Sequence, residues 1–129
     1  MNKASGYGEV MLGQHEILFG LKKVGGQMIP LKFGTNTYRL LCEAKGFEFY
    51  QMEDYLKGNP FAMLELSYFA YVTAMRMRGE PTEIGLDTFV ELAGDDADFI
   101  KEVGKIMEGA RMWGRTVDEA KKKRTDQVE

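Results

Sequence analysis

"NPFAMLELSYFAYVTAMRMRG", residues 59–79, is the most apolar stretch of the chain. Asparagine followed by proline is a strong start signal for a helix, because Asn59 can cap the first turn and Pro60 suits the first helical position. Gly79 offers a left-handed stop. Apolar residues lie on almost every side of this predicted helix. Such a helix lies at the centre of a domain or is covered partly by another protein.

Four shorter helices are predicted around this long one. Apolar residues recur with helical spacing at residues 35–45, 48–57, 86–93 and 95 to about 110. Thr35 or Asn36 can cap the first of these helices, Gly46 can end it, and Asp95 can begin the last. The fold class that follows is mainly α, with about five helices.

A β-hairpin is predicted before the first helix. Two runs of alternating apolar residues, Ile17 to Leu21 and Ile29 to Phe33, flank a glycine pair. A three-residue loop of residues 24–26 would place Phe19 opposite Leu31, so that both apolar sets face one side. Pro30 then belongs on an exposed edge, because it cannot donate a ladder hydrogen bond.

The chain of 129 residues fits one domain with two different ends. Residues 1–14 carry no sustained hydrophobic period and predict a flexible lead-in. Residues 15–114 predict a single helical domain that includes the hairpin. Residues 115–129 are rich in lysine, arginine and acidic residues, which predicts a solvated, charged tail.

Composition disfavours two classes of partner. Seventeen basic and twenty acidic residues give a net charge of -3, the wrong sign for a protein that holds nucleic acid through its phosphates. The long apolar stretch is interrupted by charged and polar residues and falls short of the roughly 20 apolar residues of a membrane span. We therefore expect neither nucleic acid nor a membrane as partner. A single cysteine and the lack of a secretion-signal pattern favour a reducing cytoplasm.

No pattern in the sequence specifies a catalytic or metal site. His15 and Cys42 could form a nucleophilic pair, but an exposed imidazole and a packed thiol are the favoured interpretation. The acidic cluster at residues 95–98 fails as a calcium loop, because Lys101 stands where glycine is needed and Met107 where glutamate is needed. We expect a protein that is not an enzyme and that has no cofactor and no metal.

The stretches "GGQMIPLKFGTNTYRLLCEAKGFEFYQMEDYL" and "NPFAMLELSYFAYVTAMRMRGEPTEIGLDTFVELAGDD" resemble the tail assembly chaperones of tailed bacteriophages. Proteins of that family often show the same order of elements. A short strand reaches "FGTN" before a first helix that ends in glycine. A second short helix, a long apolar helix, a proline-containing break and an acidic-capped helix follow. The resemblance covers about residues 25–110 and contains no defined site motif, so no family binding residue can be transferred.

The resemblance implies a non-catalytic protein of the host cell cytoplasm that binds the hydrophobic, helical tape measure protein while the tail is assembled. Such a client segment could lie on an apolar helix face in a helix-in-groove manner. The candidate partner-binding residues are Phe69, Tyr71, Met75 and Trp113, aromatic or methionine positions expected to lie off the central stripe of the long helix. Symmetric self-association through this helix, giving a homo-oligomer, is an open alternative.

Two other functions remain open from the sequence. The chain could be a structural phage component such as a tail completion or connector protein. It could also be a small helical DNA-binding regulator, although its acidic balance and the lack of a basic recognition helix oppose this hypothesis.

Overall fold

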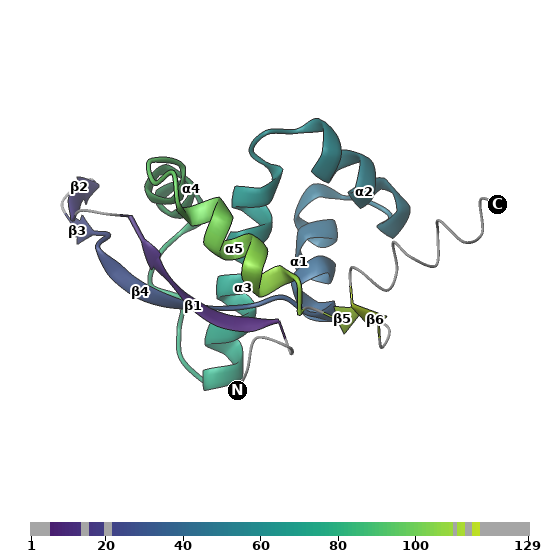
Figure 1. Cartoon of the computed structure of the whole chain (residues 1–129), viewed down its shortest axis with the longest axis horizontal. Coiled ribbons are helices and arrows are strands. Elements are labelled where there is room, and N and C mark those ends of the chain that lie inside the picture. The colour runs from purple at the N-terminus through teal and green to yellow at the C-terminus, as the bar shows by residue number, and fades with distance from the viewer. Residues whose placement is uncertain (1–5, 14–15, 20–21, 110, 113–114, 117–129) are drawn as a thin grey trace.

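The computed structural model of the protein describes residues 6–13, 16–19, 22–109, 111–112 and 115–116. In chain order the elements are β1 (Tyr7–Leu12), β2 (Ile17–Phe19), β3 (Lys22–Val24), β4 (Gln27–Lys32), α1 (Thr35–Lys45), α2 (Phe49–Gly58), α3 (Ala62–Arg78), α4 (Leu86–Gly94), α5 (Phe99–Met107), β5 (Arg111–Met112) and β6 (Arg115–Thr116). The prediction of a mainly α fold with an N-terminal hairpin is confirmed. Figure 1 shows the helices grouped together, with the β2–β3 end of the strands projecting beyond them.

The N-terminal strands form a long antiparallel ribbon. β1 pairs with β4, so that Val10 lies opposite Ile29, and β2 pairs with β3 further out. The Gly26 N–H donates to the carbonyl of Leu12 at 2.9 Å where the inner pair begins. Gly13, Gly25 and Gly26 all have positive φ at this junction. Glycine adopts such angles without steric cost, which lets the ribbon change direction between its two pairs.

The predicted partner of β4 is wrong. Phe19 pairs with Lys22 rather than with Leu31, and Leu31 pairs with Gly8. Leu21, the last residue of the first predicted strand, lies outside the described residues. The prediction failed because it started the strand pattern at residue 15 and left out β1, which supplies the complementary apolar side chains.

The expectation of a flexible lead-in over residues 1–14 is also wrong for Tyr7–Leu12, which form β1. Val10 and Leu12 are buried and alternate with exposed Glu9 and Met11. This alternation is the pattern of a strand with one face on the core. Pro30 lies on a strand with one pairing partner among the described residues, as predicted, but it is buried rather than exposed.

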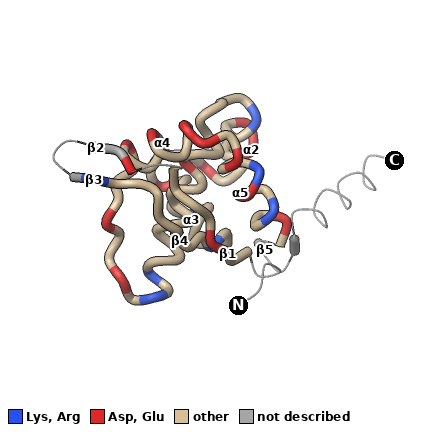
Figure 2. Tube along the Cα trace, turned by 60° about the vertical axis from the view of Figure 1, so that its left-hand side comes forward, with Lys and Arg blue, Asp and Glu red and all other residues tan. Residues whose placement is uncertain are grey.

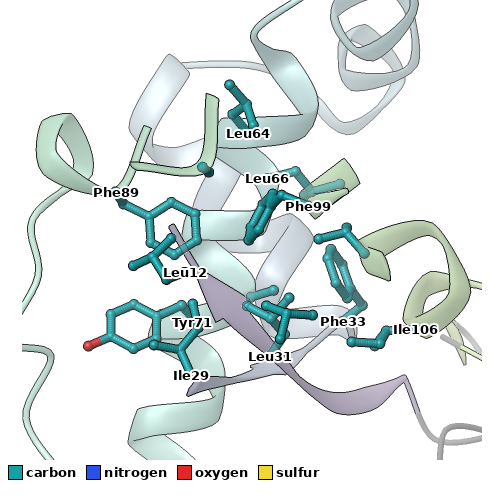
Figure 3. Close-up of a cluster of buried hydrophobic side chains, with 14 of the residues drawn as sticks. Leu12, Ile29, Leu31, Phe33, Leu64, Leu66, Tyr71, Phe89, Phe99 and Ile106 are labelled. Carbon is teal, nitrogen blue, oxygen red and sulfur yellow. The ribbon is translucent and has the colours of Figure 1, made fainter. Parts of the chain in front are cut away.

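The hydrophobic core surrounds α3, which contacts β4, α1, α2, α4 and α5. Figure 3 shows side chains of the ribbon facing those of α3, α4 and α5 in one cluster. Aromatic rings link the helices: Phe89 of α4 lies 5.8 Å from Tyr71 of α3 and 5.9 Å from Phe99 of α5, between ring centroids. The largest fully buried side chains are Phe33, Phe89, Phe99, Leu12, Leu31, Leu41 and Leu66.

Thr37 joins β4, α1 and α3. Its hydroxyl donates to the carbonyl of Lys32, and accepts from the N–H of Gly34 at 3.2 Å. The same Oγ1 lies 3.1 Å from Oγ1 of Thr73, whose own hydroxyl donates to the carbonyl of Phe69. The predicted cap at Thr35 or Asn36 is wrong, because Gly34 is the residue before the helix and no side chain caps it.

Helix ends follow the sequence signals more closely than helix starts. Gly46 and Gly79 adopt the left-handed conformation, each with φ 71°, and end α1 and α3 as predicted. α3 starts at Ala62, later than predicted, because the Asn59 side chain accepts from the Phe61 N–H in a turn before the helix.

The C-terminal part departs from the predicted pattern. α5 starts at Phe99, where Asp96 accepts from the Asp98 N–H, and ends at Met107 rather than near residue 110. Arg115 and Thr116, predicted as the start of the charged tail, pair with β5. Residues 117–129 lie outside the described residues.

Candidate partner-binding surfaces

Tyr71 does not lie on an accessible face. Only 3% of the surface of Tyr71 is accessible to solvent, and its ring stacks on Phe89 at an interplanar angle of 28°. Figure 3 shows the ring inside the apolar cluster with the hydroxyl at its margin. Burial raises the pKa of this hydroxyl, and backbone hydrogen bonds from Glu83 and Ile84 act in the opposite direction. The expectation that Tyr71 lies off the central stripe of the helix is wrong.

The other predicted contact residues on α3 are only partly accessible. Phe69 and Met75 are half-buried and pack against the core, and the Phe69 ring meets Tyr68 edge-on with centroids 5.3 Å apart. Trp113 lies outside the described residues. A partner-binding role for Phe69 and Met75 stays a prediction, because each has only part of its surface exposed.

Exposed apolar side chains lie at the ends and outer faces of the elements rather than along the middle of α3. Met11 and Met28 face each other across the outer side of the ribbon, and both are exposed. Tyr50, at the start of α2, is 75% exposed. The full set of exposed large apolar side chains is Met11, Met28, Phe49, Tyr50, Phe61, Met77 and Ile100.

A cavity of about 370 Å³ opens where the start of α1 meets the last turns of α3, and we call it the α1–α3 groove. Lys32 at the end of β4, Arg39 on α1 and Arg76 on α3 supply its cationic side chains. The complete lining is Lys32, Gly34, Thr35, Asn36, Arg39, Leu40, Thr73, Arg76 and Met77. The described residues that line it include no carboxylate.

The groove has a positive local charge although the chain carries a net charge of -3. Arg39 forms an ion pair with Glu43 at 2.7 Å and donates to the Asn36 side chain at 3.1 Å. No hydrogen-bond or ion-pair partner of the Arg76 guanidinium occurs within the described part of the chain. Burial lowers the pKa of Lys32. Figure 2 shows basic and acidic residues interspersed along the trace, so this cluster is a local feature.

A second hollow, of about 400 Å³, lies between β1 and the start of α5. Its carboxylates are Asp96, Asp98 and Glu102, while Met11 and Lys101 also line it. Asp96 is mostly buried, and its side chain accepts from the Asp98 N–H at 3.0 Å in an Asx turn just before α5. This hollow is therefore acidic, in contrast to the α1–α3 groove.

Cys42 has the properties of a packed thiol. It is half-buried on α1, and burial, followed by the negative charge of Glu48, raises the pKa of its thiol. A nucleophilic cysteine needs the opposite shift, because the thiolate is the reactive form. His15 lies outside the described residues, so the sequence-derived pair cannot be placed. Across the described ranges, no group of three or more His, Cys, Asp or Glu side chains is arranged to hold a metal ion.

No described helix is long and apolar enough to cross a membrane.

Sequence reasoning missed the α1–α3 groove. Lys32, Arg39 and Arg76 are far apart in the sequence and share no motif. They meet because α1 runs back along α3, with Thr37 beside Thr73 and Lys45 paired with Glu65. Predicting the groove would have required this helix pairing, which the hydrophobic pattern alone does not specify.

No protein-family model, no curated protein and no solved structure matches this chain. The resemblance to tail assembly chaperones therefore stays a prediction made from the sequence.

Proposed function

We propose that the protein is a non-catalytic tail assembly chaperone of a tailed bacteriophage, which binds the hydrophobic, helical tape measure protein in the host cytoplasm. The sequence resemblance motivates the proposal. The order of elements supports it, since β4 leads through "FGTN" into α1, followed by short α2, long α3 and the acidic start of α5.

The observation that carries the proposal is the pair of exposed methionines on the ribbon. Met11 and Met28 lie directly opposite each other, while Val10 and Ile29 beside them are buried. The core is therefore complete without these two side chains. Methionine is flexible and polarizable, so a surface of this kind can adapt to several apolar partner shapes. An adaptable apolar surface on a closed core suits a chaperone that holds a client temporarily.

Co-expression with the tape measure protein tests the proposal. We expect the chain to keep this client soluble and to co-purify with it, and the double substitution Met11→Asp with Met28→Asp to lower the recovered client. Gln27→Asp is the matched control, because residue 27 is also exposed on β4 but is polar. Circular dichroism confirms that each variant remains folded. Equal client recovery from all variants would refute the role of the ribbon, and insoluble client in every case would refute the chaperone function.

A structural tail component is the alternative that this proposal must exclude. A chaperone leaves the particle after assembly, whereas a completion or connector protein persists in it. Mass spectrometry of purified virions should therefore find the chain absent or far below the level of tail proteins. Stoichiometric amounts would favour the structural role. The DNA-binding hypothesis predicts binding to duplex DNA at low salt, which we expect to be undetectable.

A further inference from the structure

We propose that the α1–α3 groove is the docking site for a short acidic segment of the client, with carboxylates flanking an apolar side chain. This inference rests on the proposed function, and it names the chemistry by which one segment of the client is recognised. The groove is distinct from the exposed methionines of the ribbon. Lys32 and Met28, at opposite ends of β4, mark the two surfaces.

Charge complementarity identifies the occupant. Lys32, Arg39 and Arg76 line the cavity, and the described lining residues include no carboxylate. The first turn of α1, which also lines it, contains no acidic residue. A partner with acidic side chains would meet cations on three elements, whereas a basic segment would place like charges beside them. Complementary charges of this kind contribute mainly to specificity and to the association rate.

The apolar part of the groove sets what accompanies the carboxylates. Leu40 of α1 is half-buried, and Met77 of α3 is 54% exposed. These side chains lie among the cations, so an acidic segment that also carries a leucine or methionine buries apolar surface on binding. A volume of about 370 Å³ is near the lower end of the range for ligand pockets, which suits a few side chains rather than a whole helix.

The walls of the groove are held in place before any partner arrives. Thr37 links the carbonyl of Lys32 to Thr73, so β4, α1 and α3 are joined beside the cavity. Thr37 is fully buried and Thr73 is 6% exposed. Arg39 is further oriented by Asn36 and Glu43. A site with fixed walls loses less conformational entropy on binding than a mobile surface does.

The direct test uses two synthetic helical peptides as probes. One carries a leucine with one glutamate a helical turn before it and another a helical turn after it, so that the three side chains share a face. The other peptide has lysine in place of each glutamate. Binding to the full chain is measured by fluorescence anisotropy at low and at high salt. We expect the acidic peptide to bind, with affinity falling as salt rises, and the basic peptide not to bind.

Arg76→Glu should weaken binding of the acidic peptide by roughly tenfold, because it places a like charge in the groove. Lys101→Glu is the matched control, since it makes the same change of charge at an exposed position of α5 outside the groove. It should leave the affinity within about twofold, the scale expected of a screened surface charge. Met77→Ser, which keeps the cations, should also weaken binding of the acidic peptide.

The inference would be overturned by equal binding of both peptides, by equal effects of Arg76→Glu and Lys101→Glu, or by full competition from inorganic phosphate at an ionic strength where sodium chloride has no effect, which would indicate a site for small anions only. Formation of oligomers that Arg76→Glu abolishes, without peptide binding, would assign the groove to a second copy of the chain and would also refute the inference.

Client recovery separates the two proposals. If wild type and Arg76→Glu recover the client equally, the groove inference fails and the chaperone function stands. If the acidic peptide binds but the client is never recovered, the chaperone function fails.

Discussion

The middle of α3 and its last turns both carry large apolar side chains but have different surroundings. Leu66 and Ala70 are fully buried, enclosed by the ribbon and the other helices. Met77, two turns further on, is exposed beside Arg76 at the edge of the α1–α3 groove. The difference shows that an apolar helix can be covered entirely by its own chain along most of its length. Surface for a partner then remains only where the covering elements end.

Substitutions at Leu66 and Met77 test this contrast with the largest expected effect. Leu66→Ala should lower the free energy of unfolding by roughly 2 to 5 kcal/mol, because it leaves a cavity in a closed core. Met77→Ala should change it by less than about 0.5 kcal/mol, as is usual for an exposed side chain. Urea denaturation followed by circular dichroism measures both. Similar losses for the two variants would contradict the view that only the middle of α3 is enclosed.

The sequence predicted the helices well because their signals are local. Gly46 and Gly79 mark helix ends whatever the rest of the chain does, since few other residues adopt a left-handed conformation easily. The cover over α3 was predicted poorly because it depends on contacts between distant segments. β1 pairs with β4 although β2 and β3 lie between them in the sequence. The alternating apolar pattern of β1, with Val10 and Leu12, is too short to predict this pairing.

Gly8→Ala tests whether β1 belongs to that cover. A Cβ on residue 8 would lie 2.7 Å from Cδ1 and Cγ1 of Ile106, which is buried on α5. The resulting overpacking should cost roughly 1 to 3 kcal/mol of unfolding free energy. Adding Ile106→Val, which removes Cδ1, should recover part of that loss in a double-mutant cycle. An unchanged stability of Gly8→Ala would mean that β1 does not pack against α5 as described.

Thr37→Val, a smaller change, tests the junction that holds the walls of the groove. The substitution keeps the shape of the side chain but removes the hydroxyl that bonds Lys32 and Gly34. We expect a loss of about 1 to 2 kcal/mol in unfolding free energy, the usual scale for two hydrogen bonds. Affinity for the acidic peptide should fall as well, because the groove loses its fixed geometry. Thr82→Val, at an exposed position between α3 and α4 that does not line the groove, is the control and should change neither quantity.

The candidate site could be predicted from the sequence only in part. The predicted partner-binding residues Phe69, Tyr71 and Met75 lie on α3, whereas the exposed methionines of the described residues are Met11, Met28 and Met77, and Met77 alone of these lies on α3. Which of these residues would be exposed could not be deduced, because helical periodicity places Tyr71 and Met77 on faces whose neighbours are unknown. The covering of each face is set by the tertiary arrangement of α1, α4 and the ribbon.

The smallest expected effect concerns Cys42, which lies on α1 beside the enclosed part of α3. Burial and the charge of Glu48 raise the pKa of its thiol in the folded chain, so the folded state binds that proton more tightly than the unfolded state does. This contribution to stability is present below the unfolded pKa and is lost as the pH rises through the folded one. The rate of iodoacetamide alkylation should therefore reach its midpoint at a higher pH for native protein than for protein in urea, because only the thiolate reacts. Cys42→Ser gives the blank. Coincident midpoints would mean that the thiol is as solvated as in the unfolded chain, and that the cover extends less far along α1 than along α3.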